Sequence, residues 1–257
     1  MGVVLTFLMG TVLGLLGGGG SILTVPILVY FFDVPAVTAT SYSLFVVGIT
    51  SALIAYRLAG QIAFRIAVIF AIPATVGVLA ARVVLLTMIP SQFVLFGQMM
   101  TKDQLIMGVF AILILVISVF MFRAKEDSDS IKKQKVTLPR AILIGVEGVV
   151  VGALTGFVGA GGGFMIVPAL VLLVGIELRP AIATSLLIIA IKSLLGFVSD
   201  VQLLTAIDWP LLLSFTGVAI CGGLVGMVVQ TKVPTRQLRQ LFAYFVFVMG
   251  ITIWVMN

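Results

Sequence analysis

The sequence predicts an all-α membrane protein made of two inverted repeats, each a glycine-broken, re-entrant helical hairpin followed by three transmembrane helices. Hydrophobic residues make up 61% of the 257 residues and charged residues only 9%, whereas soluble domains carry about 25% charged residues. Two long apolar stretches flank one charged segment, and both stretches carry the same glycine and proline pattern. A separate soluble catalytic domain of ordinary size is therefore excluded.

The charged segment divides the chain into two halves. Arg123 to Arg140 contains six Lys and Arg residues and three acids. We expect a first membrane repeat over 1–122, a cytoplasmic hydrophilic linker over 123–140 and a second membrane repeat over 141–257. The net charge of +6 is typical of a bilayer protein with cationic cytoplasmic loops, and no nucleic-acid partner is expected.

The two halves repeat one another. Seven residues recur 142 positions later, namely Gly10, Gly14, Gly17, Gly19, Gly20, Val25 and Pro26. The tripeptide Ala39-Thr40-Ser41 recurs 144 positions later as Ala183-Thr184-Ser185. Because several matched positions are glycine or proline, this pattern indicates an internal duplication.

Each half opens with an apolar run that is too long for one helix. Residues 1–32 carry no charged side chain, and as one helix they would extend about 48 Å across a hydrocarbon layer of about 30 Å. Glycines at 17–20 interrupt this run, and residues 159–163 interrupt the second run, 138–176. Each glycine costs a helix interior about 1 kcal/mol. We therefore expect two short helices in each run, joined by irregular backbone.

Three ordinary spans are expected after each opening run, near residues 35–56, 66–89 and 104–122, and then 180–199, 209–230 and 237–256. Loop charges indicate whether the opening runs cross the membrane. If both runs cross, the loop cations divide 8 to 6 between the two sides, but if both are re-entrant hairpins they divide 12 to 2, inside to outside. The positive-inside rule favours the hairpins, and one hairpin plus three crossings makes the repeats inverted.

The glycine breaks are the predicted substrate site. Irregular backbone at membrane depth is tolerated where it is buried in protein or lines a wet cavity. Two corresponding breaks should meet near the pseudo-two-fold axis, where the N-termini of the following half-helices would bind a small anion. The alternative is that the glycines only allow close helix packing. We assign that packing role to the Gly10-xxx-Gly14 and Gly148-xxx-Gly152-xxx-Gly156 patterns.

The predicted site residues lie at or near the glycine breaks, or inside the spans that follow them. They are Gly18, Gly19, Gly20, Ser21, Thr40, Ser41, Gly161, Gly162, Gly163, Phe164, Thr184, Ser185 and Lys192. The hydroxyl groups would donate to an oxyanion or, alternatively, to carbonyl groups of their own helices. Lys192 lies in mid-span without an acid nearby in sequence, and such a residue is a functional candidate.

Two other charged residues have more than one interpretation, and three have a single one. Glu147 would carry a coupling proton or pair with Arg140. Arg82 would bind within the membrane or extend to the interface. Asp33, Asp200 and Asp208 are interpreted as loop acids.

Several functions are excluded by missing residues. The chain has no histidine and one cysteine, and it contains no GxxxxGK[ST] phosphate-binding loop. We therefore expect no enzyme activity, no catalytic residues, no metal site and no cofactor. The Gly222-xxx-Gly226 pattern is suited to packing within the protomer or between the copies of a homodimer.

The doubled motif, Gly14 to Pro26 and Gly156 to Pro168 with their Thr-Ser pairs, resembles the TauE/SafE sulfite exporter family. This resemblance covers essentially the whole chain. It implies a multi-pass transporter of the bacterial inner membrane that exports a small sulfur-containing anion such as sulfite or an organosulfonate. With the predicted site, it implies alternating access between the repeats. An anion channel and a non-transporting membrane assembly factor are the alternatives.

Overall fold

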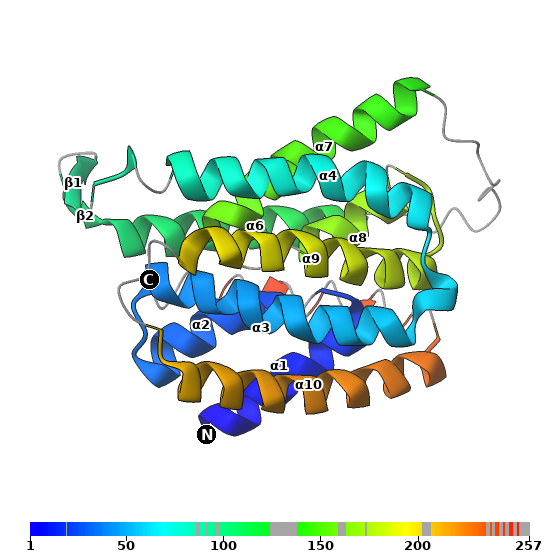
Figure 1. The fold of residues 1–257 in the computed structure, drawn as a ribbon, viewed down its shortest axis with the longest axis horizontal. Coiled ribbons are helices and arrows are strands. Elements are labelled where there is room, and N and C mark those ends of the chain that lie inside the picture. The colour runs from blue at the N-terminus through cyan, green and yellow to red at the C-terminus, as the bar shows by residue number, and fades with distance from the viewer. Residues whose placement is uncertain are drawn as a thin grey trace.

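The structure is a computed structural model that describes residues 1–18, 20–85, 88–90, 92–95, 98–123, 138–158, 163–172, 174–201 and 207–234. Beyond these it describes positions 237, 240, 241, 244, 247, 248 and 251. Long helices lie side by side in a bundle (Figure 1), and the prediction of a helical protein with membrane-length helices is confirmed. The sixth expected span, 237–256, lies mostly outside the described residues.

The first apolar run forms two helices, as expected. Helix α1 (Gly2–Leu16) ends at Gly17, whose left-handed backbone lets its N–H donate to the carbonyl oxygen of Leu13. Helix α2 (Ser21–Phe32) begins after Gly20 and ends at Asp33, also left-handed with a φ of 54°. The glycine break therefore separates two helices that share one apolar run.

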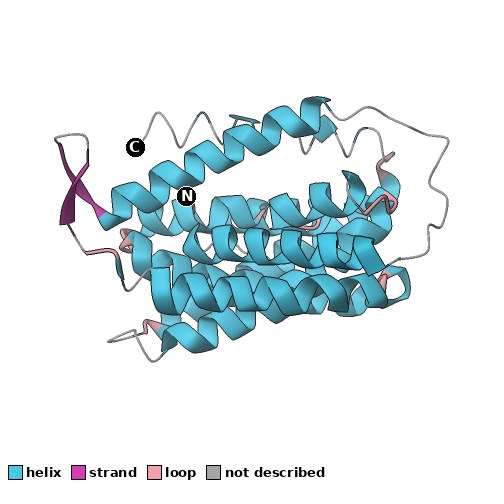
Figure 2. Ribbon diagram, turned by 90° about the horizontal axis from the view of Figure 1, so that it is seen from above, coloured by secondary structure: helices cyan, strands magenta, loops and turns pink. Residues whose placement is uncertain are grey.

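The rest of the first half contains two membrane-length helices and a hairpin. Helix α3 (Ala36–Arg57) leads through a short 3-10 turn, η1 (Ala59–Gln61), into α4 (Phe64–Ala80) and a π-helical turn, η2 (Ala81–Leu85). Strands β1 (Gln92–Leu95) and β2 (Gln98–Thr101) then pair antiparallel with Gln92 opposite Thr101. Figure 2 shows this hairpin projecting at one end of the bundle, where it leads into α6 (Lys102–Arg123).

The hairpin was not predicted, because the sequence places it in a connection between two expected spans. Phe93 and Val94 favour extended backbone, but four-residue strands are too short to stand out against the apolar helices on either side. The expected boundaries of the neighbouring spans are nevertheless close to those of α4 and α6.

The second half follows the same order. It contains α7 (Leu138–Val158), α8 (Gly163–Leu172), α9 (Leu178–Val201) and α10 (Trp209–Lys232). By length and hydropathy, four helices of the described residues qualify as membrane spans: Ala36–Arg57, Phe64–Val84, Leu178–Val201 and Trp209–Lys232. Large apolar side chains on the outer faces of α4, α7 and α10 are exposed, as expected of helices that face lipid.

Each half packs its first helix against the second membrane-length helix of the other half. Helix α1 lies along α10, and α7 lies along α4. A Cβ atom on Gly10 or Gly14 would overlap carbonyl oxygens of α10, and one on Gly152 would overlap the carbonyl oxygen of Ala74. The predicted packing role of these glycines is confirmed.

The two interfaces correspond in detail. Gly77 faces Val149 and Ala153, and Gly222, which lies 145 positions after Gly77, faces Phe7 and Thr11. Gly222 and Gly226 therefore pack within the protomer, against α1, and any homodimer contact would use another surface.

Helices α3 and α9 form the centre of the bundle and run antiparallel (Figure 1). Ser41 near the start of α3 contacts Asp200 near the end of α9, and Gly48 faces Leu194. Because α3 and α9 are related by the 144-residue repeat, Gly48 and Lys192 occupy equivalent positions where the two helices cross. Lys192 thus lies at the centre of the arrangement.

Candidate functional site

The two glycine breaks meet inside the protein. Gly17 and Gly18 have φ values of 67° and 142°, which residues other than glycine rarely adopt. A Cβ atom on Gly18 would overlap the Cα atom of Gly163, and one on Gly163 would overlap the Cα atom of Gly18. The start of α8 therefore lies against the residues that precede α2, and two helix N-termini with partial positive charge converge.

Some predicted residues at the breaks have structural roles. The Ser21 hydroxyl donates to the carbonyl oxygen of Gly18 at 2.5 Å, which closes the turn before α2. A Cβ atom on Gly20 would overlap the backbone of α1 at Met9 and Leu13. Gly19, Gly161 and Gly162 lie outside the described residues, as does the side chain of Phe164.

The predicted hydroxyl pair of the second half contacts the backbone of the first half. Thr184 Oγ1 accepts a hydrogen bond from the Ala63 N–H at 3.0 Å, at the start of α4. The Ser185 Oγ lies 2.7 Å from the carbonyl oxygen of Gly17 and 2.8 Å from that of Ile182. Both side chains are fully buried. They hold α9 against the end of α1 and the start of α4.

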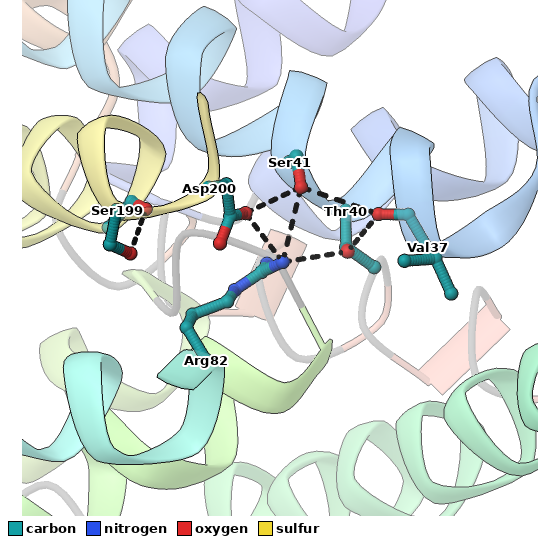
Figure 3. Close-up of polar contacts among 7 residues, drawn as sticks. Val37, Thr40, Ser41, Arg82, Ser199 and Asp200 are labelled. Atoms are coloured by element: carbon teal, nitrogen blue, oxygen red, sulfur yellow. Dashed lines mark hydrogen bonds and ion pairs between the residues drawn. The ribbon is translucent and has the colours of Figure 1, made fainter. Parts of the chain in front are cut away.

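The equivalent pair in the first half contacts an arginine instead. Arg82 Nη1 donates to Thr40 Oγ1 at 3.0 Å and lies 3.4 Å from Ser41 Oγ. The Thr40 hydroxyl also donates to the carbonyl oxygen of Val37 at 2.7 Å. Figure 3 shows Arg82 extending from η2 toward both hydroxyls and toward Asp200.

Asp200 is part of this cluster, so its interpretation as a loop acid is wrong. It lies in the last turn of α9, is only 4% exposed and accepts a hydrogen bond from Arg82 Nη1 at 2.9 Å on Oδ2. Ser41 Oγ donates to the same oxygen at 2.5 Å. The sequence suggested a loop because α9 was expected to end at residue 199. The helix continues two residues further, to Val201, and so places the Asp200 carboxylate beside η2.

Arg82 does not extend to an interface. It is 1% exposed, and its Nε and Nη2 atoms have no hydrogen-bond partner among the described residues. The π-helical turn that carries Arg82 is a distortion often found at functional sites. A charge at the edge of an apolar span is a sequence signal for each of these two residues separately, but it does not indicate that they pair.

Lys192 is fully buried in α9. Its Nζ atom donates to Thr155 Oγ1 of α7 at 2.6 Å, and Thr155 in turn lies 3.2 Å from the carbonyl oxygen of Gly152. In the part of the chain that the structure describes, no carboxylate lies within ion-pair distance of this ammonium. Thr155 precedes the second glycine break by about one helical turn, and Ile189, three residues before Lys192, contacts Gly163. Lys192 therefore adjoins the breaks.

The buried charges leave an excess of one positive charge. Arg82 and Lys192 are buried cations, and among the described residues Asp200 is the buried carboxylate, which pairs with Arg82. An uncompensated charge in a low-dielectric interior is costly. A bound monoanion would balance it.

Glu147 lies apart from this cluster. Its side chain is partly exposed, and its Oε2 atom has no hydrogen-bond partner among the described residues. Asp33 ends α2, and Asp208 accepts a hydrogen bond from the Leu211 N–H at the start of α10. The interpretation of Asp33 and Asp208 as loop acids agrees with these positions.

Residues 2–253 match the family described as Sulfite exporter TauE/SafE. The chain belongs to this family. TauE/SafE proteins are membrane transporters and not enzymes. No solved structure matches the chain.

Three curated relatives match this TauE/SafE protein over nearly its full length. A "Probable membrane transporter protein" from Xylella fastidiosa (strain 9a5c) is 29% identical, with 96% of this chain and 92% of the relative covered. "Probable membrane transporter protein YdhB" from Bacillus subtilis (strain 168) is 27% identical, with 92% of each chain covered. "Probable membrane transporter protein YunE" from the same strain is 27% identical, with 96% and 94% covered.

Proposed function

We propose that this protein is a secondary transporter that exports a small sulfur-containing anion, such as sulfite or an organosulfonate, across the bacterial inner membrane. The substrate binds between the two repeats, at the level of Lys192 and the converging N-termini of α2 and α8. Alternating access results from movement of one repeat against the other about this site.

Lys192 is the observation that carries the proposal. A buried ammonium whose described partner is a neutral hydroxyl, Thr155 Oγ1, requires an anion to balance its charge. The helix N-termini of α2 and α8 add partial positive charge. A small oxyanion with several acceptor oxygens fits this set of donors.

The helix packing supports inverted repeats. Helices α3 and α9 correspond in the repeat yet run antiparallel where they cross, as Ser41 with Asp200 and Gly48 with Leu194 show. Two equivalent spans that run in opposite directions are related by an axis in the membrane plane. The same axis relates the α1–α10 pair to the α7–α4 pair.

Helix length supports a re-entrant hairpin in the first half. Helix α1 has 15 residues and α2 has 12, so they extend about 22 Å and 18 Å. Neither crosses about 30 Å of hydrocarbon, and Gly17 and Gly18 provide the turn between them. The hairpins place residues 123–140 in the cytoplasm under the positive-inside rule.

Thermal unfolding of the detergent-purified protein tests the substrate class. The panel contains sulfite, sulfate, thiosulfate, taurine, sulfoacetate and chloride at constant ionic strength. A ligand present at one hundred times its Kd adds about 2.7 kcal/mol to the free energy of unfolding, which raises the Tm by on the order of 5 °C. We expect this shift for a sulfur oxyanion, and we expect Lys192→Ala to remove it. An equal Tm shift in Lys192→Ala would show that the anion binds at a site that does not involve Lys192.

A further inference from the structure

The Arg82–Asp200 pair is incompletely matched. A guanidinium offers five N–H donors in a planar fork, and it usually binds a carboxylate through two parallel hydrogen bonds. Here only Nη1 reaches Asp200, and only through Oδ2. Nε and Nη2 are buried without partners among the described residues. The Arg82 guanidinium therefore has N–H donors, on Nε and Nη2, that make no hydrogen bond to the described residues.

The surrounding polar groups suit the oxygens of a bound anion. Thr40 and Ser41 place two hydroxyls against Nη1, and both can turn their hydrogen toward an incoming oxygen. Ser41 now donates to Asp200 Oδ2. If Asp200 moved away, Arg82, Thr40 and Ser41 would all face the vacated oxygen position.

The repeat argues against a purely structural role for the pair. Helices α4 and α10 correspond at a separation of 145 residues, which makes Met227 the counterpart of Arg82. At the 144-residue separation of α3 and α9, the counterpart of Asp200 is Tyr56, which is 78% exposed. The equivalent junction in the other half is therefore built without an ion pair.

We propose that Arg82 is a second anion-binding residue of this protein and that Asp200 occupies its guanidinium only when the anion is absent. The small oxyanion displaces the Asp200 carboxylate and binds to Nε and the Nη atoms, with Thr40 and Ser41 donating to it. The excess positive charge of the Arg82, Lys192 and Asp200 group is balanced in the same step. The identity of the anion in this inference rests on the proposed function, whereas its charge and its small size do not.

The test measures anion-dependent thermal stability of the purified full chain with sulfite and with formate, which resembles the displaced carboxylate. Asp200→Asn removes the internal competitor, so we expect the apparent Kd for both anions to fall about tenfold or more. Formate should also restore part of the Tm that this variant loses. Arg82→Gln should abolish the anion response, and Arg82→Lys should recover only part of it. Arg57→Gln is the control, because Arg57 is exposed.

A milder variant covers the case in which Asp200→Asn does not fold. Ser41→Ala removes one hydrogen bond to Asp200 and should lower the apparent Kd by a few fold. Ser43→Ala is the matched control, since Ser43 is buried two residues away with an unpartnered hydroxyl. An affinity in Ser41→Ala equal to that of the control, or a normal anion response in Arg82→Gln, would overturn the inference.

Transport separates this inference from the proposed function. If wild-type protein in liposomes transports sulfite and Arg82→Gln transports it equally well, the inference is wrong and the function stands. If wild type transports no sulfur anion but Asp200→Asn is stabilised by formate through Arg82, the function is wrong and the inference stands. If no anion stabilises wild type, Asp200→Asn or Ser41→Ala, both are wrong.

Discussion

Gly18 and Gly163 pack backbone against backbone, so that a Cβ atom on either residue would overlap the Cα atom of the other. The two glycine breaks of the duplicated chain are thus in direct contact. This contact brings together the starts of two half-helices, one from each half of the sequence. Ile189, one helical turn before Lys192 in α9, contacts Gly163 at this point.

Replacing either glycine should separate the breaks. Gly163→Ala forces a methyl group into the backbone at Gly18, and overpacking of this kind costs about 1–3 kcal/mol. We expect a lower Tm and loss of sulfite transport, measured by thermal unfolding and by flux in proteoliposomes. Gly217→Ala is the control, because a Cβ atom there meets nothing within 4 Å. Normal flux in Gly163→Ala would show that transport does not need the contact.

Removing the charge of Lys192 should affect function more than stability. Lys192→Met keeps the length of the side chain, removes a buried charge with no described carboxylate partner, and leaves Thr155 bonded to Gly152. Replacing buried charges by apolar groups of similar volume is often neutral or stabilising. We expect an unchanged or higher Tm together with loss of transport. A large drop in Tm would indicate that the lysine is needed for folding.

The interface between α1 and α10 should be intolerant of small additions. A Cβ atom on Gly14 would overlap the carbonyl oxygen of Gly223, so Gly14→Ala must push the two helices apart. We expect a loss of about 1–3 kcal/mol in the free energy of unfolding. The corresponding variant, Gly156→Ala between α7 and α4, should behave in the same way. Equal stability of Gly14→Ala and Gly217→Ala would contradict the packing described for α1.

Membrane topology can be tested with single cysteines in a Cys221→Ser background, because Cys221 is exposed. Re-entrant hairpins place the loop at Glu177 inside the cell and the loop at Asp208 outside. Eight full crossings reverse both positions. We expect an impermeant maleimide to label Asp208→Cys but not Glu177→Cys in intact cells. Labelling after lysis controls for access, and the reverse pattern would exclude the hairpins.

Much of the fold follows from sequence because the relevant signals are local or periodic. The charge-free run before Asp33, the glycines at 17–20 and the repeated Thr-Ser pairs each correspond to a described feature. The role of Gly10 and Gly14 in packing also followed from their spacing. The short hairpin after Leu85 did not, since four-residue strands produce no pattern that rises above the apolar background.

The site was only partly predictable for a physical reason. Lys192 stands out because a buried charge is conspicuous in an apolar span. Asp200 is 118 residues from Arg82, and only the packing of η2 against the end of α9 brings them together. Thr155 likewise has no sequence signal of its own, and its role is seen only from the hydrogen bond that Lys192 Nζ donates to it. Long-range pairing of this kind depends on helix register, which one sequence does not specify.

Counterflow in proteoliposomes tests the central claim most directly. Vesicles containing wild-type protein are loaded with unlabelled sulfite and placed in a trace of ³⁵S-sulfite. We predict saturable uptake that depends on internal sulfite and that is absent in Lys192→Met, with Arg57→Gln as the control. Uptake that is linear in sulfite concentration and independent of internal sulfite would indicate a channel. No uptake, or equal uptake by Lys192→Met, would contradict a sulfur-anion transporter that works through Lys192.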